Sequence, residues 1–121
     1  MTTSEIATVL AWHDALNERD FDTLVELSSD DVEVGDAKGA GQGHDALLEW
    51  ARSADITAEP GRMYVHDGVV VVEQQITSAA GNTSAAAAFR VVRDHVTSMF
   101  RHADLASALA ATELTEKDLA G

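Results

Sequence analysis

The sequence contains no cysteine, and this absence excludes several classes of site. Without thiolates there is no disulfide framework, no cysteine-ligated zinc or iron–sulfur site and no cysteine nucleophile. The chain also lacks GxGxxG, Walker and GxSxG motifs, so nothing supports nucleotide binding or serine hydrolysis. The five histidines show no paired spacing such as HxxxH. We therefore expect neither a metal nor a cofactor.

Positively charged residues are scarce. Eight Lys and Arg stand against 21 Asp and Glu, which gives a formal net charge of -13. Such a field repels phosphate backbones and anionic lipids, so we expect no nucleic-acid or membrane partner. No stretch approaches the roughly 20 apolar residues of a membrane helix, and the N-terminal sequence lacks the basic start of a secretory signal. These features predict a cytoplasmic location.

The length and the spacing of apolar residues predict one domain over residues 1–121. Helical periodicity covers residues 3–18, 21–28 and about 44–54, with Asp20 placed to cap the second helix. Residues 31–36 alternate as a strand does, and the glycines at 39, 41 and 43 predict a loop.

From residue 58 onward the period becomes that of strands. We expect strands near 61–66, 69–77, 83–93 and 96–103, joined by turns at residues 67–68, 80–82 and 94–95. A short helical tail starts at about residue 104, and Thr115 and Asp118 have the spacing of a capping box. Helices followed by an antiparallel meander predict an α+β domain with helices on one face of a curved sheet.

Several short motifs carry a resemblance to a known family. They are WHDALN at 12–17, DFD at 20–22, DDV at 30–32, the glycine-rich segment and AFRVV at 88–92. Over about residues 5–104 the chain resembles the SnoaL-like branch of the nuclear transport factor 2 (NTF2-like) superfamily. The resemblance implies a cone, in which three N-terminal helices pack on the concave face of a curved, mainly antiparallel sheet. It implies no single activity, because the superfamily includes ketosteroid isomerases, polyketide cyclases, dehydratases and non-catalytic binders.

Asp36 is the first candidate catalytic residue. It shares strand parity with Val32 and Val34, so it should point toward the core if the strand persists that far. A desolvated carboxylate can act as a general acid or base near neutral pH, and the resemblance places Asp36 where ketosteroid isomerases carry their proton-shuttling aspartate. The alternative is a turn residue whose side chain bonds nearby backbone amides. The sequence leaves both open.

At two positions the sequence departs from the pattern of the ketosteroid isomerases that it resembles. Such an isomerase needs hydrogen-bond donors for the developing enolate oxygen. The two positions that would supply them are occupied by Trp12 and Ala87, and only the indole of Trp12 can donate.

His13 is the second candidate catalytic residue, because it interrupts an apolar helix stripe. It could carry protons in a pocket, although a buried histidine satisfied by a backbone carbonyl is favoured. Glu73 lies in a strand whose face the sequence does not assign, so it enters the pocket or meets solvent or a partner subunit. We expect an apolar pocket lined by Trp12, Leu16, Trp50, Glu73, Ala87, Phe89 and Met99.

Two functions remain compatible with the sequence. The first is a cofactor-independent acid/base enzyme of isomerase, cyclase or dehydratase type, acting through Asp36 on a hydrophobic ring-containing molecule. The second is a non-catalytic small-molecule-binding or dimerisation module. The resemblance further implies a homodimer of about 26 kDa through the convex sheet face, twice the chain mass of 12.8 kDa.

Overall fold

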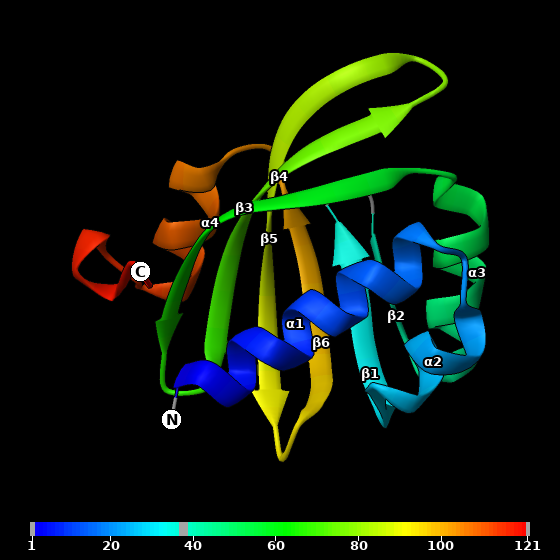
Figure 1. The fold of residues 1–121 in the computed structure, drawn as a ribbon, viewed down its shortest axis with the longest axis horizontal. Coiled ribbons are helices and arrows are strands. Elements are labelled where there is room, and N and C mark those ends of the chain that lie inside the picture. The colour runs from blue at the N-terminus through cyan, green and yellow to red at the C-terminus, as the bar shows by residue number, and fades with distance from the viewer. Residues whose placement is uncertain (1, 37–38, 121) are drawn as a thin grey trace.

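The computed structural model describes residues 2–36 and 39–120 (Figure 1). Within these ranges the chain forms helices and strands in the order α1 (Thr2–Asn17), α2 (Phe21–Glu26), β1 (Ser28–Asp36), β2 (Gly39–Gln42), α3 (His44–Ala54), β3 (Thr57–His66), β4 (Val69–Ser78), β5 (Gly81–Val92), β6 (His95–His102), α4 (Leu105–Thr112) and the 3-10 turn η1 (Glu116–Asp118). The bounds agree with the predicted elements to within a few residues, except for β2.

The six strands form one curved sheet in the order β2-β1-β6-β5-β4-β3. All neighbouring pairs are antiparallel except β1 and β6, which run parallel. The sequence correctly predicted the β3–β6 meander and the α+β class. This arrangement is the curved sheet expected of an NTF2-like cone.

Strand β2 corrects the prediction of a glycine-rich loop. Gly39 pairs with Asp36 and Gly41 pairs with Val34, so the segment extends the sheet. The small residues permit close packing, because a Cβ atom added at Gly41 would lie 2.9 Å from the Cβ of Ala46 on α3. The prediction failed because a Gly-Ala-Gly stretch carries no apolar alternation.

The tight turns have the backbone that two-residue hairpins require. Asp67 and Gly68 have φ values of 48° and 78°, and Arg93 and Asp94 have values of 51° and 65°. Positive φ at both central residues is the signature of a type I′ turn, which matches the twist of the flanking strands. The first turn was predicted correctly, whereas the second lies one residue before its predicted position.

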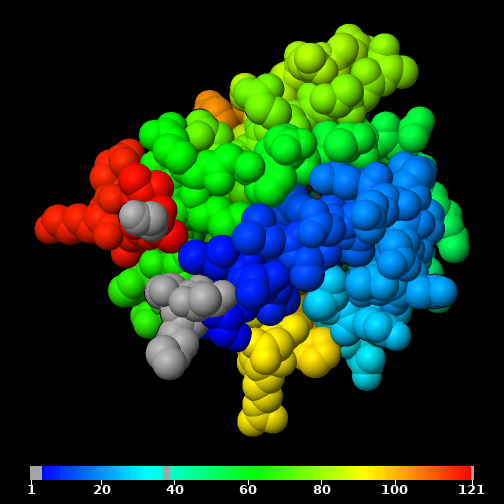
Figure 2. Space-filling view, in the orientation of Figure 1, coloured from blue at the N-terminus to red at the C-terminus, as the bar shows by residue number. Residues whose placement is uncertain are grey.

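Helix α1 crosses one face of the sheet, and α2 and α3 continue this cover toward β1 and β2 (Figure 1). In the space-filling view α1 hides much of the sheet, while the tip of the β4–β5 hairpin protrudes beyond the body (Figure 2). Beneath the helices lies the main core, which includes Val9, Leu24, Leu47 and Val70. Full burial of each such side chain stabilises the fold by about 1.5–3 kcal/mol.

Helix α4 covers the opposite, convex face. Ala108 and Leu114 are buried there against Tyr64, Val71 and Ala86. The side chain of Asp104 caps α4 by accepting from Ser107 N at 2.8 Å, and the predicted capping box at Thr115 and Asp118 is present. In the described part of the chain, no helix is long and apolar enough to span a membrane.

Candidate functional site

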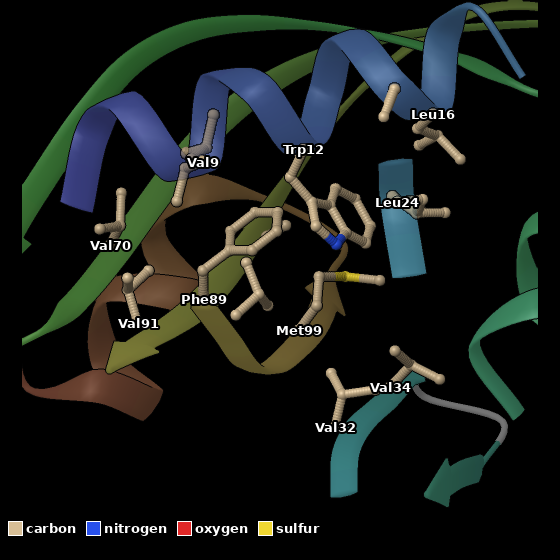
Figure 3. Close-up of a cluster of buried hydrophobic side chains, with 14 of the residues drawn as sticks. Val9, Trp12, Leu16, Leu24, Val32, Val34, Val70, Phe89, Val91 and Met99 are labelled. Carbon is tan, nitrogen blue, oxygen red and sulfur yellow. The ribbon is translucent and has the colours of Figure 1, made fainter. Parts of the chain in front are cut away.

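The space between α1 and the concave sheet is filled by side chains (Figure 3). Trp12, Phe89 and Met99 are each 1% exposed. The rings of Trp12 and Phe89 meet edge to face, with centroids 5.2 Å apart, a favourable geometry for aromatic pairs. Leu16 and Ala87 are buried in the same core. Most of the residues expected to line an apolar pocket therefore form the hydrophobic core.

The indole of Trp12 is already hydrogen-bonded. Its Nε1–H donates to Ser28 Oγ at 3.2 Å, and that hydroxyl donates to the backbone oxygen of Leu24 at 2.8 Å. Ala87 has no polar side-chain atom. The two positions at which the resemblance implies enolate donors thus offer no available hydrogen bond.

His13 is fully buried on α1 beside Phe89. Its Nδ1 lies 2.8 Å from the Val9 backbone oxygen, and its Nε2 lies 2.8 Å from Gln74 Nε2. An amide nitrogen only donates, so Nε2 of His13 accepts and Nδ1 carries the proton. Burial lowers the pKa of His13 below its ordinary value of 6.5, although its bond to Val9 and the charge of Asp14 oppose the shift.

Gln74 is a polar core residue that sequence analysis did not single out. It follows Val70 and Val72 on the concave face of β4, and it is 4% exposed. Its Oε1 is buried and has no hydrogen-bond partner among the described residues. A glutamine within an alternating valine strand was the available signal.

Asp36 lies at the end of β1 and is exposed to solvent, although Val32 and Val34 before it are buried. Strand parity therefore continues as predicted, but the expected burial of the carboxylate does not follow. The reason is local, since Asp36 pairs with Gly39, which has no side chain to cover it.

Asp36 borders two cavities. The first, which we call the α3 cavity, has a volume of 610 Å³ and lies between α3 and strands β1 and β2. Its lining residues are Val34, Asp36, Gly39, Ala40, Gly41, Ala46, Glu49, Trp50 and Ser53. The structure thus brings Asp36 and Trp50 together, two residues that the sequence selected independently.

The second cavity, which we call the α4 cavity, has a volume of 760 Å³ and lies on the convex side, against the C-terminal end of α4. Its lining residues are Asp36, Val69, Ala88, Phe89, Arg90, Ser98, Phe100, Arg101, His102, Ala103, Ala110, Ala111, Thr112 and Glu113. Of the site residues selected from the sequence, Asp36 and Phe89 are in this lining.

Glu73 lies on the sheet face away from α1. It alternates with the buried Gln74 and accepts from Arg62 Nε at 2.9 Å. This hydrogen bond lowers the pKa of Glu73 and raises the pKa of Arg62. Glu73 is therefore remote from His13 and lines neither cavity. Among the described residues, no three His, Asp or Glu side chains gather to hold a metal ion.

Comparisons with known proteins agree with this architecture. An NTF2-like protein of unknown function from Cytophaga hutchinsonii is 15% identical, with a TM-score of 0.76 over 83% of this chain and 89% of that chain. A candidate polyketide cyclase from Sinorhizobium meliloti is 22% identical, with a TM-score of 0.74 over 79% and 94%. TerC, co-crystallised with polyporic acid, is 19% identical, with a TM-score of 0.71 over 92% and 97%.

These structural similarities establish the fold alone. A search of curated proteins finds no match. A family model described as a SnoaL-like domain matches residues 9–105, which is most of the sequence. The chain belongs to the SnoaL-like domain family.

Proposed function

We propose that this SnoaL-like domain binds a small ring-containing molecule in the α3 cavity, without catalysing a reaction. The observation that carries the proposal is that Asp36 and Trp50 line the same 610 Å³ space. This volume lies within the range of roughly 300–1,000 Å³ that is usual for small-molecule sites. The similarity to TerC, which was co-crystallised with polyporic acid, supports binding as the function.

The lining of the α3 cavity defines what it would bind. Trp50, Val34 and Ala46 offer apolar surface, and Trp50 is half-buried, unlike the enclosed Trp12. Asp36 and Glu49 supply carboxylate oxygens, which accept hydrogen bonds. The matching ligand has an aromatic or alicyclic ring that packs against Trp50 and a hydroxyl or amine that donates to a carboxylate.

Binding without catalysis is the reading that the polar groups support. An enolate-type reaction needs preorganised donors, which usually provide the largest catalytic contribution. Here the Trp12 indole bonds Ser28, Ala87 has no donor, and His13 is enclosed in the core. In the α3 cavity Asp36 and Glu49 supply acceptors, and the side-chain donors of the lining are the indole of Trp50 and the hydroxyl of Ser53. Neither donor occupies a position at which the resemblance implies an enolate donor.

An acid/base enzyme is the second candidate, and the exposure of Asp36 favours it. An accessible carboxylate at the border of a cavity can reach a proton on a bound molecule. In this case Asp36→Asn would abolish turnover of a cyclic ketone or epoxide while leaving its binding nearly intact. A pure binder shows no turnover in either form.

The experiment uses 2-naphthol as a probe and follows Trp50 fluorescence in the full chain. We expect saturable quenching, and we expect Asp36→Asn to weaken binding by about tenfold through loss of a charged acceptor. The matched control is Asp31→Asn, an exposed acid on the same strand that lines neither cavity. Equal affinities for the two variants would contradict the proposed role of Asp36, and absence of binding would contradict the site.

The convex face of the sheet is the surface through which we expect a homodimer to form. Helix α4 already covers Val71, Ala86 and Ala88, so a second copy would contact the remaining part around Phe100. Light scattering at micromolar concentration separates a dimer of about 26 kDa from the 12.8 kDa chain.

A further inference from the structure

The α4 cavity lies on the face of the sheet opposite α1, and the strand register orders its lining. Across β5 and β6, Arg90 is paired with Ser98, Ala88 with Phe100, and Ala86 with His102. Residues two apart share a face, so these pairs form three successive rows. The rows of Arg90 and His102 are four residues apart, which corresponds to about 13 Å at the usual rise of a strand. The cavity is therefore elongated along the strands.

The middle of this cavity is apolar. Ala88 and Phe100 form its floor, and Ala110 and Ala111 of α4 also line it. Alanines at three of these positions leave room above the Phe100 ring. A flat apolar group would bury this surface on binding.

The Arg90 end of the cavity carries a base, and the lining also includes an acid. Arg90 is the strand partner of Val69, and Val69 packs against the buried cluster that includes Leu114, the residue that follows Glu113. Arg90 lines the cavity from β5, and Glu113 lines it from the C-terminal end of α4. Among the described residues, neither makes a side-chain hydrogen bond or ion pair.

The other end of the cavity is polar as well. His102 lines it from β6. His102 pairs with Ala86 and shares the sheet face of Arg90, so its imidazole faces this cavity. A neutral imidazole donates one hydrogen bond and accepts another. This end therefore also offers both a donor and an acceptor.

Donors and acceptors in the lining of this cavity favour a ligand with hydroxyl groups. A hydroxyl donates one hydrogen bond and accepts others, so it can satisfy an arginine and a carboxylate together, whereas a carboxylate ligand can only accept. The formal net charge of -13 further disfavours approach by anions. We propose that the α4 cavity is a second ligand site, for an elongated uncharged molecule with an apolar ring core and a hydroxyl group at each end.

The test is an NMR titration of the full chain with 4,4′-dihydroxybiphenyl, 4-hydroxybiphenyl and biphenyl-4,4′-dicarboxylate. We expect the dihydroxy compound to shift the Ala88 and Ala110 methyl signals. We also expect it to bind about tenfold more tightly than the monohydroxy compound, as one further hydrogen-bonded end implies. The dicarboxylate should bind more weakly than either.

Arg90→Gln isolates one end of the site. It should weaken binding of the dihydroxy compound by about tenfold, whereas Arg93→Gln, an exposed arginine outside the cavity lining, should leave binding unchanged. Equal effects of the two substitutions, or tighter binding of the dicarboxylate, would overturn the assignment of the ligand class. A different result would be a dimer of about 26 kDa in which no compound shifts the Ala88 and Ala110 signals. This result would overturn the ligand site and show that the convex face binds a second copy of the chain. Shifts confined to Trp50 would place the compounds in the α3 cavity.

Discussion

The amide nitrogen of Gln74 donates a hydrogen bond to the imidazole Nε2 of His13 over 2.8 Å, between α1 and the concave face of the sheet. Both side chains are almost completely enclosed. This bond, together with the Nδ1–H···O bond to Val9, fixes one neutral tautomer of His13. The pair ties the first helix to the middle of the sheet.

We expect Gln74→Leu to destabilise the fold by about 1–3 kcal/mol, because His13 Nε2 would become a buried acceptor without a donor. Urea denaturation measures the free energy of unfolding. The matched control is Gln75→Leu, an exposed neighbour on the same strand, which should change stability by no more than about 0.5 kcal/mol. If the double variant His13→Leu/Gln74→Leu were no more stable than Gln74→Leu alone, the two residues would not be coupled.

The buried imidazole also predicts a dependence of stability on pH. The pKa of His13 is lowered by burial in the folded chain, so below its ordinary value of 6.5 the unfolded chain binds more protons. The contribution of His13 to the free energy of unfolding is complete above pH 6.5. It decreases as the pH falls from there toward the pKa of His13 in the folded chain. The free energy of unfolding of the native chain should therefore drop more steeply between about pH 7 and pH 5 than that of His13→Leu. Parallel curves of stability against pH for the two proteins would show that His13 does not contribute to this pH dependence.

The ion pair between Glu73 and Arg62 should contribute little. Both side chains are well exposed, so solvent and salt screen their attraction. We expect Glu73→Gln to cost less than about 1 kcal/mol and to leave 2-naphthol binding unchanged. A loss of binding in a fluorescence titration would show that Glu73 takes part in ligand binding.

Strand β2 predicts a steric effect at Gly41. A Cβ atom there would lie 2.9 Å from Ala46 Cβ, and neither group can rotate away. We expect Gly41→Ala to destabilise the domain by about 1–3 kcal/mol, measured by thermal unfolding. Ala46→Gly added to this variant removes the contact and should restore part of the loss. A neutral Gly41→Ala would indicate that β2 and α3 are not packed this closely.

The predictable parts of the fold were those with strong local signals. Apolar periodicity located α3 at residues 44–54, and Asp67-Gly68 located the first tight turn. The packing of α4 was not predictable, because its alanine-rich sequence has no sharply apolar face. Strand β2 was missed because glycine and alanine carry no alternation.

The candidate site was predictable only in part. Trp50 and Asp36 were selected from the sequence and share a cavity, but strand parity could not show that Gly39 leaves Asp36 exposed. The interior pocket was expected from the resemblance, whereas large side chains such as Trp12 and Phe89 fill the space. The α4 cavity depends on the tertiary position of a C-terminal helix, which no local pattern specifies.

The most direct test of the proposed function follows the two indole N–H signals during titration with 2-naphthol. The chain has only two tryptophans, so both signals can be assigned with a single Trp50→Leu variant. We predict that the Trp50 signal shifts in a saturable way, while the signal of Trp12, whose indole is bonded to Ser28 within the core, does not. A shift of Trp12 alone would show that the ligand enters the concave interior, and no shift of either signal would contradict small-molecule binding in the α3 cavity.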